Sequence, residues 1–200
     1  MRRLVGQELT CVRGGRTVFE GLSFSVAAGE ALAVVGRNGA GKSSLLRLIC
    51  GLIRPEAGTV VAEGAAADVR VAELCHYAGH ADALKPALTT IENLAFWRDF
   101  TGDRGEDPID ALDRLGVAHL ADLPAGYLSA GQKRRVTLAR LFVTRRPIWL
   151  LDEPTAALDV RTQAALTAEM RRHLADGGVI IVATHSDLDI APMAQLEIGA

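Results

Sequence analysis

The 200-residue sequence has no long hydrophobic run and few aromatic residues, which make up 4% of the chain. The apolar stretch 179–183 is short and ends in polar residues, so it predicts a buried strand and not a membrane span. Gln7, Glu8 and Thr10 interrupt the apolar core that a signal peptide would need after the N-terminal arginines. We therefore expect a protein that stays in the cytoplasm.

The chain also lacks a charge surplus and a cysteine framework. Its formal net charge is −2 and its pI is near 6.2, so no global attraction to nucleic acid or anionic lipid is expected. Cys11, Cys50 and Cys75 are odd in number and widely separated, without the C-x-x-C spacing of zinc, disulfide or c-type haem sites. We expect these cysteines to be small buried residues in a reducing compartment.

What is present is the pattern of an α/β fold. With 49% hydrophobic and 23% charged residues, the chain can bury one substantial core. Strand-like runs cluster first and later alternate with helical patterns, which predicts an α/β fold with a small antiparallel β piece at the N-terminus. The expected strands are 4–12, 22–26, 31–35, 59–62, 74–77, 148–151 and 179–184, and the expected helices are 43–50, 90–97, 109–115, 131–144 and 161–175.

The stretch from about 89 to 145 differs from the rest because it has three helical segments and no convincing strand. We expect it to form a helical subdomain inserted into the sheet core. The whole chain, residues 1–200, is then a single domain.

The segment from Gly36 to Ser43 reads G-R-N-G-A-G-K-S and fits the pattern G-x-x-x-x-G-K-S. It follows an expected strand and opens an expected helix, as a phosphate-binding loop requires, so a chance glycine-rich turn is disfavoured. Backbone N–H groups and the helix dipole would surround the phosphates of ATP, Lys42 would bind the β- and γ-phosphates, and Ser43 would bind Mg²⁺. The candidate ATP-binding residues here are Gly36, Arg37, Asn38, Gly39, Ala40, Gly41, Lys42, Ser43 and Ser44.

The apolar strand 148–151 ends in two carboxylates, Asp152 and Glu153. Open α/β sheets bind their ligands at the carboxyl ends of strands. Asp152 can therefore hold the Mg²⁺ ion, while Glu153 can accept a proton from the water that attacks the γ-phosphate. Alone, such a pair commonly marks a strand that runs into a solvated loop, but the phosphate loop favours the catalytic interpretation.

The segment Leu-Ser-Ala-Gly-Gln at 128–132 is the most specific motif, because a general P-loop enzyme has no use for it. Ser129 can cap a helix through Gln132 and present its hydroxyl and the Gly131 amide to an anion. An ordinary capped helix would explain Ser129 alone. With these motifs the chain resembles the ATP-binding subunits of ABC transporters, which implies a P-loop NTPase core of the ABC ATPase type and ATP hydrolysis.

The resemblance extends over residues 9–188 and implies further roles. It implies that Ser129, Ala130, Gly131 and Gln132 bind the γ-phosphate held by a second copy, in a head-to-tail homodimer. Asp159, after the Pro-Thr of 154–155, matches the loop through which the two subunits sense each other. His185 matches the histidine that holds the γ-phosphate and orients the attacking water, although a lone histidine at a strand end is more often structural.

Two positions depart from the family pattern. His80 stands where most relatives carry a glutamine that binds Mg²⁺ and water, and we expect His80 to take that catalytic and metal-binding role. Arg13 stands where many relatives stack an aromatic ring on adenine, and a guanidinium plane can also stack on a base.

Five segments, 13–16, 79–86, 92–97, 129–136 and 146–151, resemble one subfamily, the haem exporter ATP-binding subunits of bacterial cytochrome c maturation. The resemblance implies a peripheral protein on the cytoplasmic face of the inner membrane. It implies a separate integral membrane subunit and further cytochrome c maturation subunits as partners. ATP hydrolysis would then power haem export or the release of a haem-loaded chaperone. The segment 83–88, in which every side chain except that of Lys85 is uncharged, is predicted to line the groove that contacts the membrane subunit through Ala83, Leu84, Lys85, Pro86 and Leu88, or alternatively to pack on the helical subdomain.

Other functions stay open at this point. The chain could serve an ABC transporter with another substrate, act as a soluble ABC ATPase on DNA or ribosomes, or be a nucleotide-binding regulator. It has neither the coiled-coil or zinc insertions of DNA-repair members nor the second cassette of translation members, and we expect no nucleic-acid partner. A regulator could dispense with Glu153 and Ser129, yet both are present.

Overall fold

The structure is a computed structural model that describes residues 1–102, 105–185 and 188–199. The chain forms two compact units. The first unit contains Met1–Gly79, Arg146–Pro154 and Met170–Ala200, and the second contains His80–Arg145 and Thr155–Glu169. No helix in the described ranges is long and apolar enough to cross a membrane.

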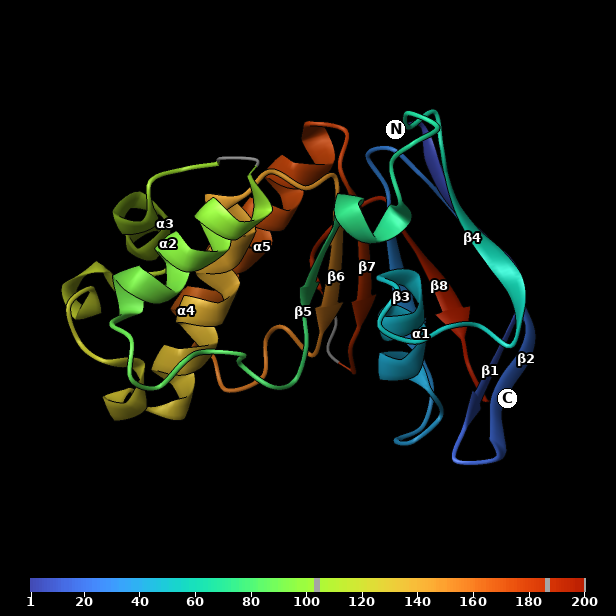
Figure 1. Cartoon of the computed structure of the whole chain (residues 1–200), viewed down its shortest axis with the longest axis horizontal. Coiled ribbons are helices and arrows are strands. Elements are labelled where there is room, and N and C mark those ends of the chain that lie inside the picture. Colours follow the sequence, from blue (N-terminus) through green and yellow to red (C-terminus); the bar gives the residue numbers. More distant parts are fainter. Residues whose placement is uncertain (103–104, 186–187, 200) are drawn as a thin grey trace. The chain divides into compact units, whose positions relative to one another are not determined.

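The first unit contains a three-stranded antiparallel sheet in the order β2-β1-β4 (Figure 1). Its strands are β1 (Arg3–Arg13), β2 (Arg16–Ala27) and β4 (Ala57–Glu63). The register of β1 on both neighbours shifts after Gly6 and Gln7. Gly58 passes close to this bulge, since a Cβ there would lie 2.3 Å from the Gln7 carbonyl oxygen. The small antiparallel piece expected from the sequence is thus confirmed.

The same unit holds a five-stranded parallel sheet in the order β5-β6-β7-β3-β8 (Figure 1). Its strands are β3 (Ala31–Val35), β5 (Cys75–Ala78), β6 (Ile148–Asp152), β7 (Val179–Ala183) and β8 (Met193–Glu197). Every residue of β6 and β7 is buried, as is typical of central strands covered on both faces. The α/β prediction is confirmed, but the sequence analysis missed β8, an edge strand whose side chains are mostly exposed.

Helix α1 (Lys42–Ile49) packs its apolar face into the core of this unit, which also contains residues of β1, β2, β3, β6 and β7. The 3-10 helix η1 (Val71–Leu74) follows β4. Cys11 lies in this core as expected, whereas Cys50 and Cys75 are only half-buried. All three are free thiols, and burial raises the pKa of each. They are therefore held in the neutral form.

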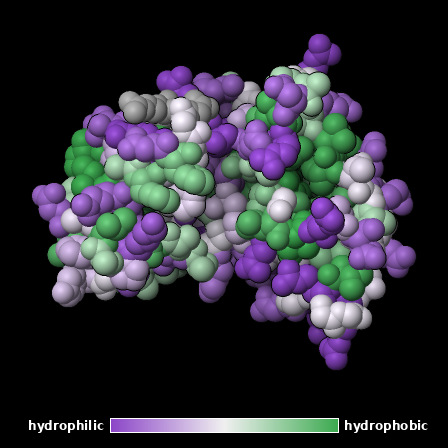
Figure 2. All heavy atoms as spheres, viewed as in Figure 1, coloured by the Kyte–Doolittle hydropathy of each residue, from purple (hydrophilic) through white to green (hydrophobic). Residues whose placement is uncertain are grey.

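An open hollow of about 720 Å³ lies in the first unit between the end of α1, β4 and η1. Its walls are largely apolar, and Figure 2 shows hydrophobic residues over α1 and β4. Leu48, Ile49 and Val60 are among the lining residues.

The second unit is helical. Its helices are α2 (Thr90–Thr101), α3 (Pro108–Arg114), α4 (Ala130–Val143) and the first part of α5 (Val160–Ala175), with the 3-10 helices η2 (Ala118–Leu120) and η3 (Ala125–Tyr127). Helices α2, α3 and α4 contact one another pairwise. Each begins at a side-chain cap, as Thr89 and Asp107 show for α2 and α3. The five helices expected from the sequence are all present, with α2 longer at its C-terminal end.

Arginines hold the helices of this unit together. Arg114 on α3 forms an ion pair with Glu106 and another with Glu169, at 2.7 Å. Arg140 on α4 lies over the ring of Trp97 on α2, 3.9 Å from its centroid. Burial lowers the pKa of Arg140 to about 10. A guanidinium at that pKa stays charged at neutral pH, so the contact with Trp97 is a cation–π pair.

Candidate functional site

The phosphate loop connects β3 to α1, in the strand–loop–helix context that its sequence predicts. Gly36 and Gly41 have φ values of 146° and 107°. A Cβ at Gly36 would lie 2.3 Å from the Ile198 carbonyl oxygen, and one at Gly41 would lie 2.4 Å from a methyl group of Val18. Both positions thus need glycine for conformation and for space.

The N-terminus of α1 is open to an anion. Its N-cap, Gly41, provides no side-chain hydrogen bond, and its first turn has no acidic residue. The first backbone N–H groups of the helix are therefore not satisfied by a side-chain cap, and they carry the positive end of the helix dipole. Ser43 and Ser44 lie half-buried in this turn.

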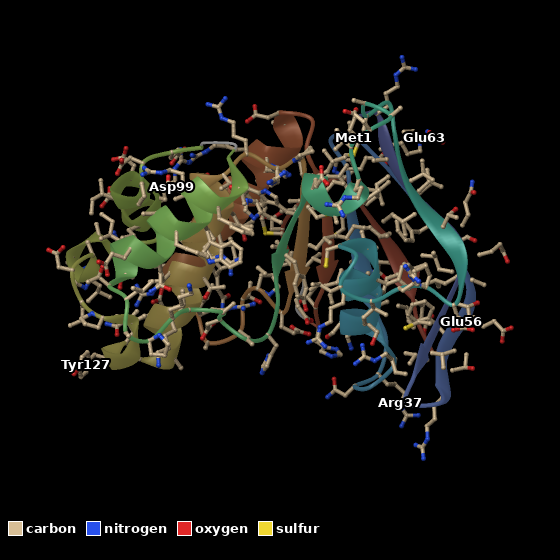
Figure 3. The ribbon with its side chains drawn as sticks, viewed as in Figure 1. Met1, Arg37, Glu56, Glu63, Asp99 and Tyr127 are labelled. Atoms are coloured by element: carbon tan, nitrogen blue, oxygen red, sulfur yellow. The ribbon has the colours of Figure 1, made fainter. Side chains whose placement is uncertain are left out.

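Lys42 is buried, with 9% of its surface exposed. Its Nζ donates to the carbonyl oxygens of Gly36, at 2.8 Å, and of Arg37, at 3.2 Å. The ammonium group is thereby held inside the loop, beside the open helix terminus. The Arg37 side chain itself is exposed at the rim of the loop (Figure 3).

Two carboxylates lie at the end of β6, as predicted. Asp152 is buried at the last position of the strand, and Glu153 comes next with a φ of 46°. The Glu153 N–H donates to the Ala183 carbonyl oxygen of β7 at 2.8 Å. A left-handed conformation is uncommon for a residue with a side chain and is often found at functional sites.

Sheet order brings these groups to one edge. Strand β7 lies between β6 and β3, and all three are parallel, so their carboxyl ends meet. His185, just after β7, places its Nε2 3.1 Å from Lys42 Nζ and 3.8 Å from Glu153 Oε1. The same Nε2 lies 2.9 Å from Asn38 Oδ1. The ammonium group of Lys42, the carboxylate of Glu153 and the imidazole of His185 thus lie close together at the phosphate loop.

The contact between Asn38 and His185 is not predicted from the sequence, although both residues are among the site candidates that the sequence gives. The two positions are 147 residues apart, and no local pattern connects them. Only the order of the strands in the sheet could have indicated that they meet.

Arg13 is exposed at the end of β1, where it is paired with Arg16 across a turn of two glycines with positive φ. Among the described residues, no hydrogen bond or ion pair links Arg13 to the phosphate loop. Its predicted stacking on adenine therefore stays a prediction.

The signature segment lies in the second unit, at the start of α4. Ser129 Oγ accepts from the Gln132 N–H at 3.3 Å, and Gln132 Oε1 accepts from the Ser129 N–H at 2.8 Å. This reciprocal pair is a capping box, so the capping role predicted for Ser129 is confirmed. Ser129 and Ala130 are exposed, and so is Tyr127 just before them (Figure 3).

Asp159 also lies in the second unit and begins a helix. Its Oδ1 accepts from the Thr162 N–H at 2.8 Å, at the start of α5. This hydrogen bond lowers the pKa of the Asp159 carboxyl. Asp159 therefore caps α5, a structural role that was not predicted from the sequence. Its dimer-sensing role stays a prediction.

His80 is the first residue of the second unit and is exposed. The loop that follows it is tied down within this unit. Thr137 Oγ1 donates to the Asp82 carbonyl oxygen at 2.8 Å. The buried Asn93 bonds to the backbone of Lys85, Leu88 and Thr89, which fixes the loop against the start of α2.

Comparisons with known proteins show the family to which the chain belongs. The family model of the ABC transporter matches residues 19–156. The chain is 59% identical over 198 residues to the "Cytochrome c biogenesis ATP-binding export protein CcmA" of Rhodopseudomonas palustris strain HaA2, covering 99% of this chain and 98% of the relative. It is 61% identical over 197 residues to the protein of the same name from strain BisB5, covering 98% of each.

Among solved structures, a dimeric ATP-binding cassette in a post-hydrolysis state with ADP and Pi is similar, with a TM-score of 0.82. The match covers 98% of this chain and 97% of that chain, at 24% sequence identity, and supports the fold alone. The identities to the sequence relatives are much higher and extend over nearly whole chains. The chain therefore belongs to the ABC transporter family and, within it, to the family of the CcmA proteins.

Proposed function

We propose that this chain is the ATP-hydrolysing motor subunit of an ABC transporter that serves cytochrome c biogenesis. In this proposal it powers haem export or the release of a haem-loaded chaperone. The observation that supports the ATPase role is that Lys42, Glu153 and His185 lie together at the carboxyl ends of the parallel strands. The His185 Nε2 is 3.1 Å from Lys42 Nζ and 3.8 Å from Glu153 Oε1. The names of the CcmA relatives support the biological process.

ATP would bind with its phosphates in the loop 36–44. Lys42 is already desolvated there, and its Nζ would exchange carbonyl partners for β- and γ-phosphate oxygens. The open N-terminus of α1 would add backbone donors and the positive end of its dipole. Arg13 would stack on the adenine.

Ser43 and Asp152 fit a magnesium ion that arrives with the nucleotide. A serine hydroxyl and a carboxylate are hard oxygen donors of the kind that Mg²⁺ prefers. No cluster of three His, Cys, Asp or Glu side chains in the described residues could hold a metal alone, so phosphate oxygens and water would complete the shell. When bound, Mg²⁺ would neutralise charge that develops on the phosphates.

Hydrolysis would use two side chains at the carboxyl ends of neighbouring strands, Glu153 after β6 and His185 after β7. Glu153 would accept the proton of the attacking water, and its backbone bond to Ala183 would fix the carboxylate at the sheet edge. His185 would bind the γ-phosphate through Nε2 and orient the water. That His80 binds the metal and water stays a prediction, because it is based only on the alignment of His80 with the glutamine of related proteins.

We propose that the working form is a head-to-tail homodimer of single nucleotide-binding domains, each spanning residues 1–200. The exposed Ser129 and the first amides of α4 would bind the γ-phosphate held by the other subunit. This helix has no acidic residue in its first turn, which would otherwise repel phosphate. Asp159 would couple the ATP site of one subunit to the ATP site of the other.

An integral membrane subunit and further cytochrome c maturation subunits are the proposed partners, and the cytoplasmic face of the inner membrane is the proposed location. The segment 83–88 would contact the membrane subunit. Leu84 and Leu88 are half-buried there, while Ala83, Lys85 and Pro86 are exposed. The hydrogen bonds of Asn93 give this segment a fixed shape to present to a partner.

A pull-down from solubilised membranes tests this proposal. Tagged chain is purified at low detergent concentration, and the co-purifying proteins are identified from their peptides. We expect an integral membrane subunit together with cytochrome c maturation proteins. Recovery of ribosomes or DNA instead, or of a membrane transporter from an unrelated system, would contradict it.

A further inference from the structure

The His185 ring nitrogen Nε2 faces two neighbours with opposite requirements. Lys42 Nζ, at 3.1 Å, can only donate, so it needs a bare Nε2. Asn38 Oδ1, at 2.9 Å, can only accept, so it needs a proton on Nε2. A neutral imidazole nitrogen can satisfy only one of them at a time. The choice decides which tautomer of His185 is present.

Lys42 does not need His185 as a hydrogen-bond acceptor. It already donates to the carbonyl oxygens of Gly36 and Arg37, and in the proposed function it turns to the phosphates of the nucleotide. Once Lys42 is engaged by phosphate, Asn38 is the neighbour that remains for Nε2. Its oxygen then favours the tautomer with the proton on Nε2, which is the form that can donate to a phosphate oxygen.

The His185 ring also needs a partner for its orientation. Its side chain is 52% exposed, and Glu153 Oε1, at 3.8 Å, is too distant for a hydrogen bond. An imidazole with this exposure and no fixed partner would rotate and exchange its proton with solvent. A hydrogen bond from the phosphate loop would hold the ring in place before the γ-phosphate arrives.

We propose that Asn38 is a positioning residue for His185. Its side-chain oxygen keeps the proton on Nε2 and holds the ring over the phosphate loop until a γ-phosphate oxygen takes over that proton as acceptor. Asn38 thus acts through His185 and not on the nucleotide itself. The inference rests on the proposed role of His185 in ATP hydrolysis.

A double-mutant cycle tests this link in the purified full-length chain. We expect Asn38→Ala to lower kcat by about 3- to 10-fold, as the loss of one hydrogen bond implies, and to change the KM for ATP by less than about twofold. In a His185→Ala background, Asn38→Ala should have no further effect on kcat. Asn38→Asp keeps an acceptor oxygen at this place and should retain most of kcat at saturating ATP, although its charge raises KM.

Gln195→Ala is the matched control, because it removes an exposed amide from β8 in the same unit and should leave kcat unchanged. Equal losses from Asn38→Ala in both backgrounds, or a change in KM alone, would make Asn38 an ordinary loop residue and overturn the proposal. Full activity of the single variant His185→Ala would instead overturn the proposed role of His185. That result is distinguishable, because this variant leaves Asn38 unchanged.

A second readout does not depend on activity. The ¹⁵N shifts of the histidine ring distinguish the two tautomers, and they can be measured in the ADP complex, where Lys42 has a phosphate partner but no γ-phosphate is present. We expect His185 to carry its proton on Nε2 in the wild type and to populate both tautomers in Asn38→Ala. The same tautomer mixture in both proteins would overturn the proposal.

Discussion

Lys42 Nζ lies 3.1 Å from His185 Nε2, although 143 positions separate the two residues in the sequence. The neighbouring parallel strands β3 and β7 create this contact, because each residue follows the carboxyl end of one of them. The phosphate loop and the histidine therefore form one site before nucleotide binds.

Lys42→Ala should abolish productive ATP binding. The substitution removes the one side-chain cation that the loop encloses, together with its hydrogen bonds to Gly36 and Arg37. Titration with a fluorescent ATP analogue measures the effect, and Gln195→Ala serves as the control. Unchanged affinity in Lys42→Ala would mean that the phosphates bind elsewhere.

Ser129 and Thr89 provide a matched pair, since each begins a helix with a complete capping box. Ser129→Ala and Thr89→Ala should each destabilise the fold by about 1 kcal/mol, the usual cost of losing such a cap. Only Ser129→Ala should also lower ATP hydrolysis, because only Ser129 is proposed to contact nucleotide. Thermal melts and ATPase assays of both variants make the comparison. Equal ATPase losses would reduce Ser129 to a helix cap.

Ser129→Arg should leave ATP binding to the single subunit intact and block the ATP-bound dimer. The added bulk and charge would lie where the signature segment is proposed to meet the other subunit. Equilibrium binding measures the first property, and gel filtration with ATP measures the second. Loss of ATP binding in this variant would speak against a site shared between subunits.

Asp159 can be tested for its two roles separately. Asp159→Asn keeps an oxygen that can accept from the Thr162 N–H, whereas Asp159→Ala does not. Asn should therefore preserve the melting temperature and Ala should lower it. If Asp159 also senses the second site through its charge, Asn should still reduce the ATPase rate of the dimer. A wild-type rate in Asp159→Asn would leave only the capping role.

His173 should make the fold sensitive to mild acid. Its ring stacks on Trp149 with centroids 4.0 Å apart, and burial lowers its pKa from 6.5 to about 4. The unfolded chain takes up a proton below pH 6.5, while the folded protein resists it until about pH 4. The free energy of unfolding should therefore fall by roughly 3 kcal/mol over this range as pH decreases.

Urea denaturation between pH 4 and pH 7.5 measures this effect. His173→Phe keeps a ring against Trp149 but cannot titrate, so its stability should change less with pH over this window. The exposed His119 offers the control, and His119→Gln should keep the wild-type slope. If His173→Phe also keeps that slope, another group is responsible for it.

Local motifs explain why much of the site could be predicted from the sequence. The loop from Gly36 to Ser43 and the cap of α4 at Ser129 each depend on neighbouring residues, so their patterns indicate their structure. Strand β8 could not be predicted in this way, since an exposed edge strand has neither a continuous apolar run nor clear alternation. The bond between Asn38 and His185 depends on the order of the strands, which no local pattern reports.

The steady-state ATPase rate of Glu153→Gln is the most direct test of the proposed role of Glu153 in ATP hydrolysis. Glutamine preserves the size of the side chain and leaves the backbone bond of residue 153 to Ala183 in place, but it cannot accept a proton. We predict that the variant binds ATP with affinity near that of the wild type, hydrolyses it about 10²- to 10⁴-fold more slowly, and accumulates as an ATP-bridged dimer. Turnover close to the wild-type rate would contradict this role, because the carboxylate beside His185 would then not be the base.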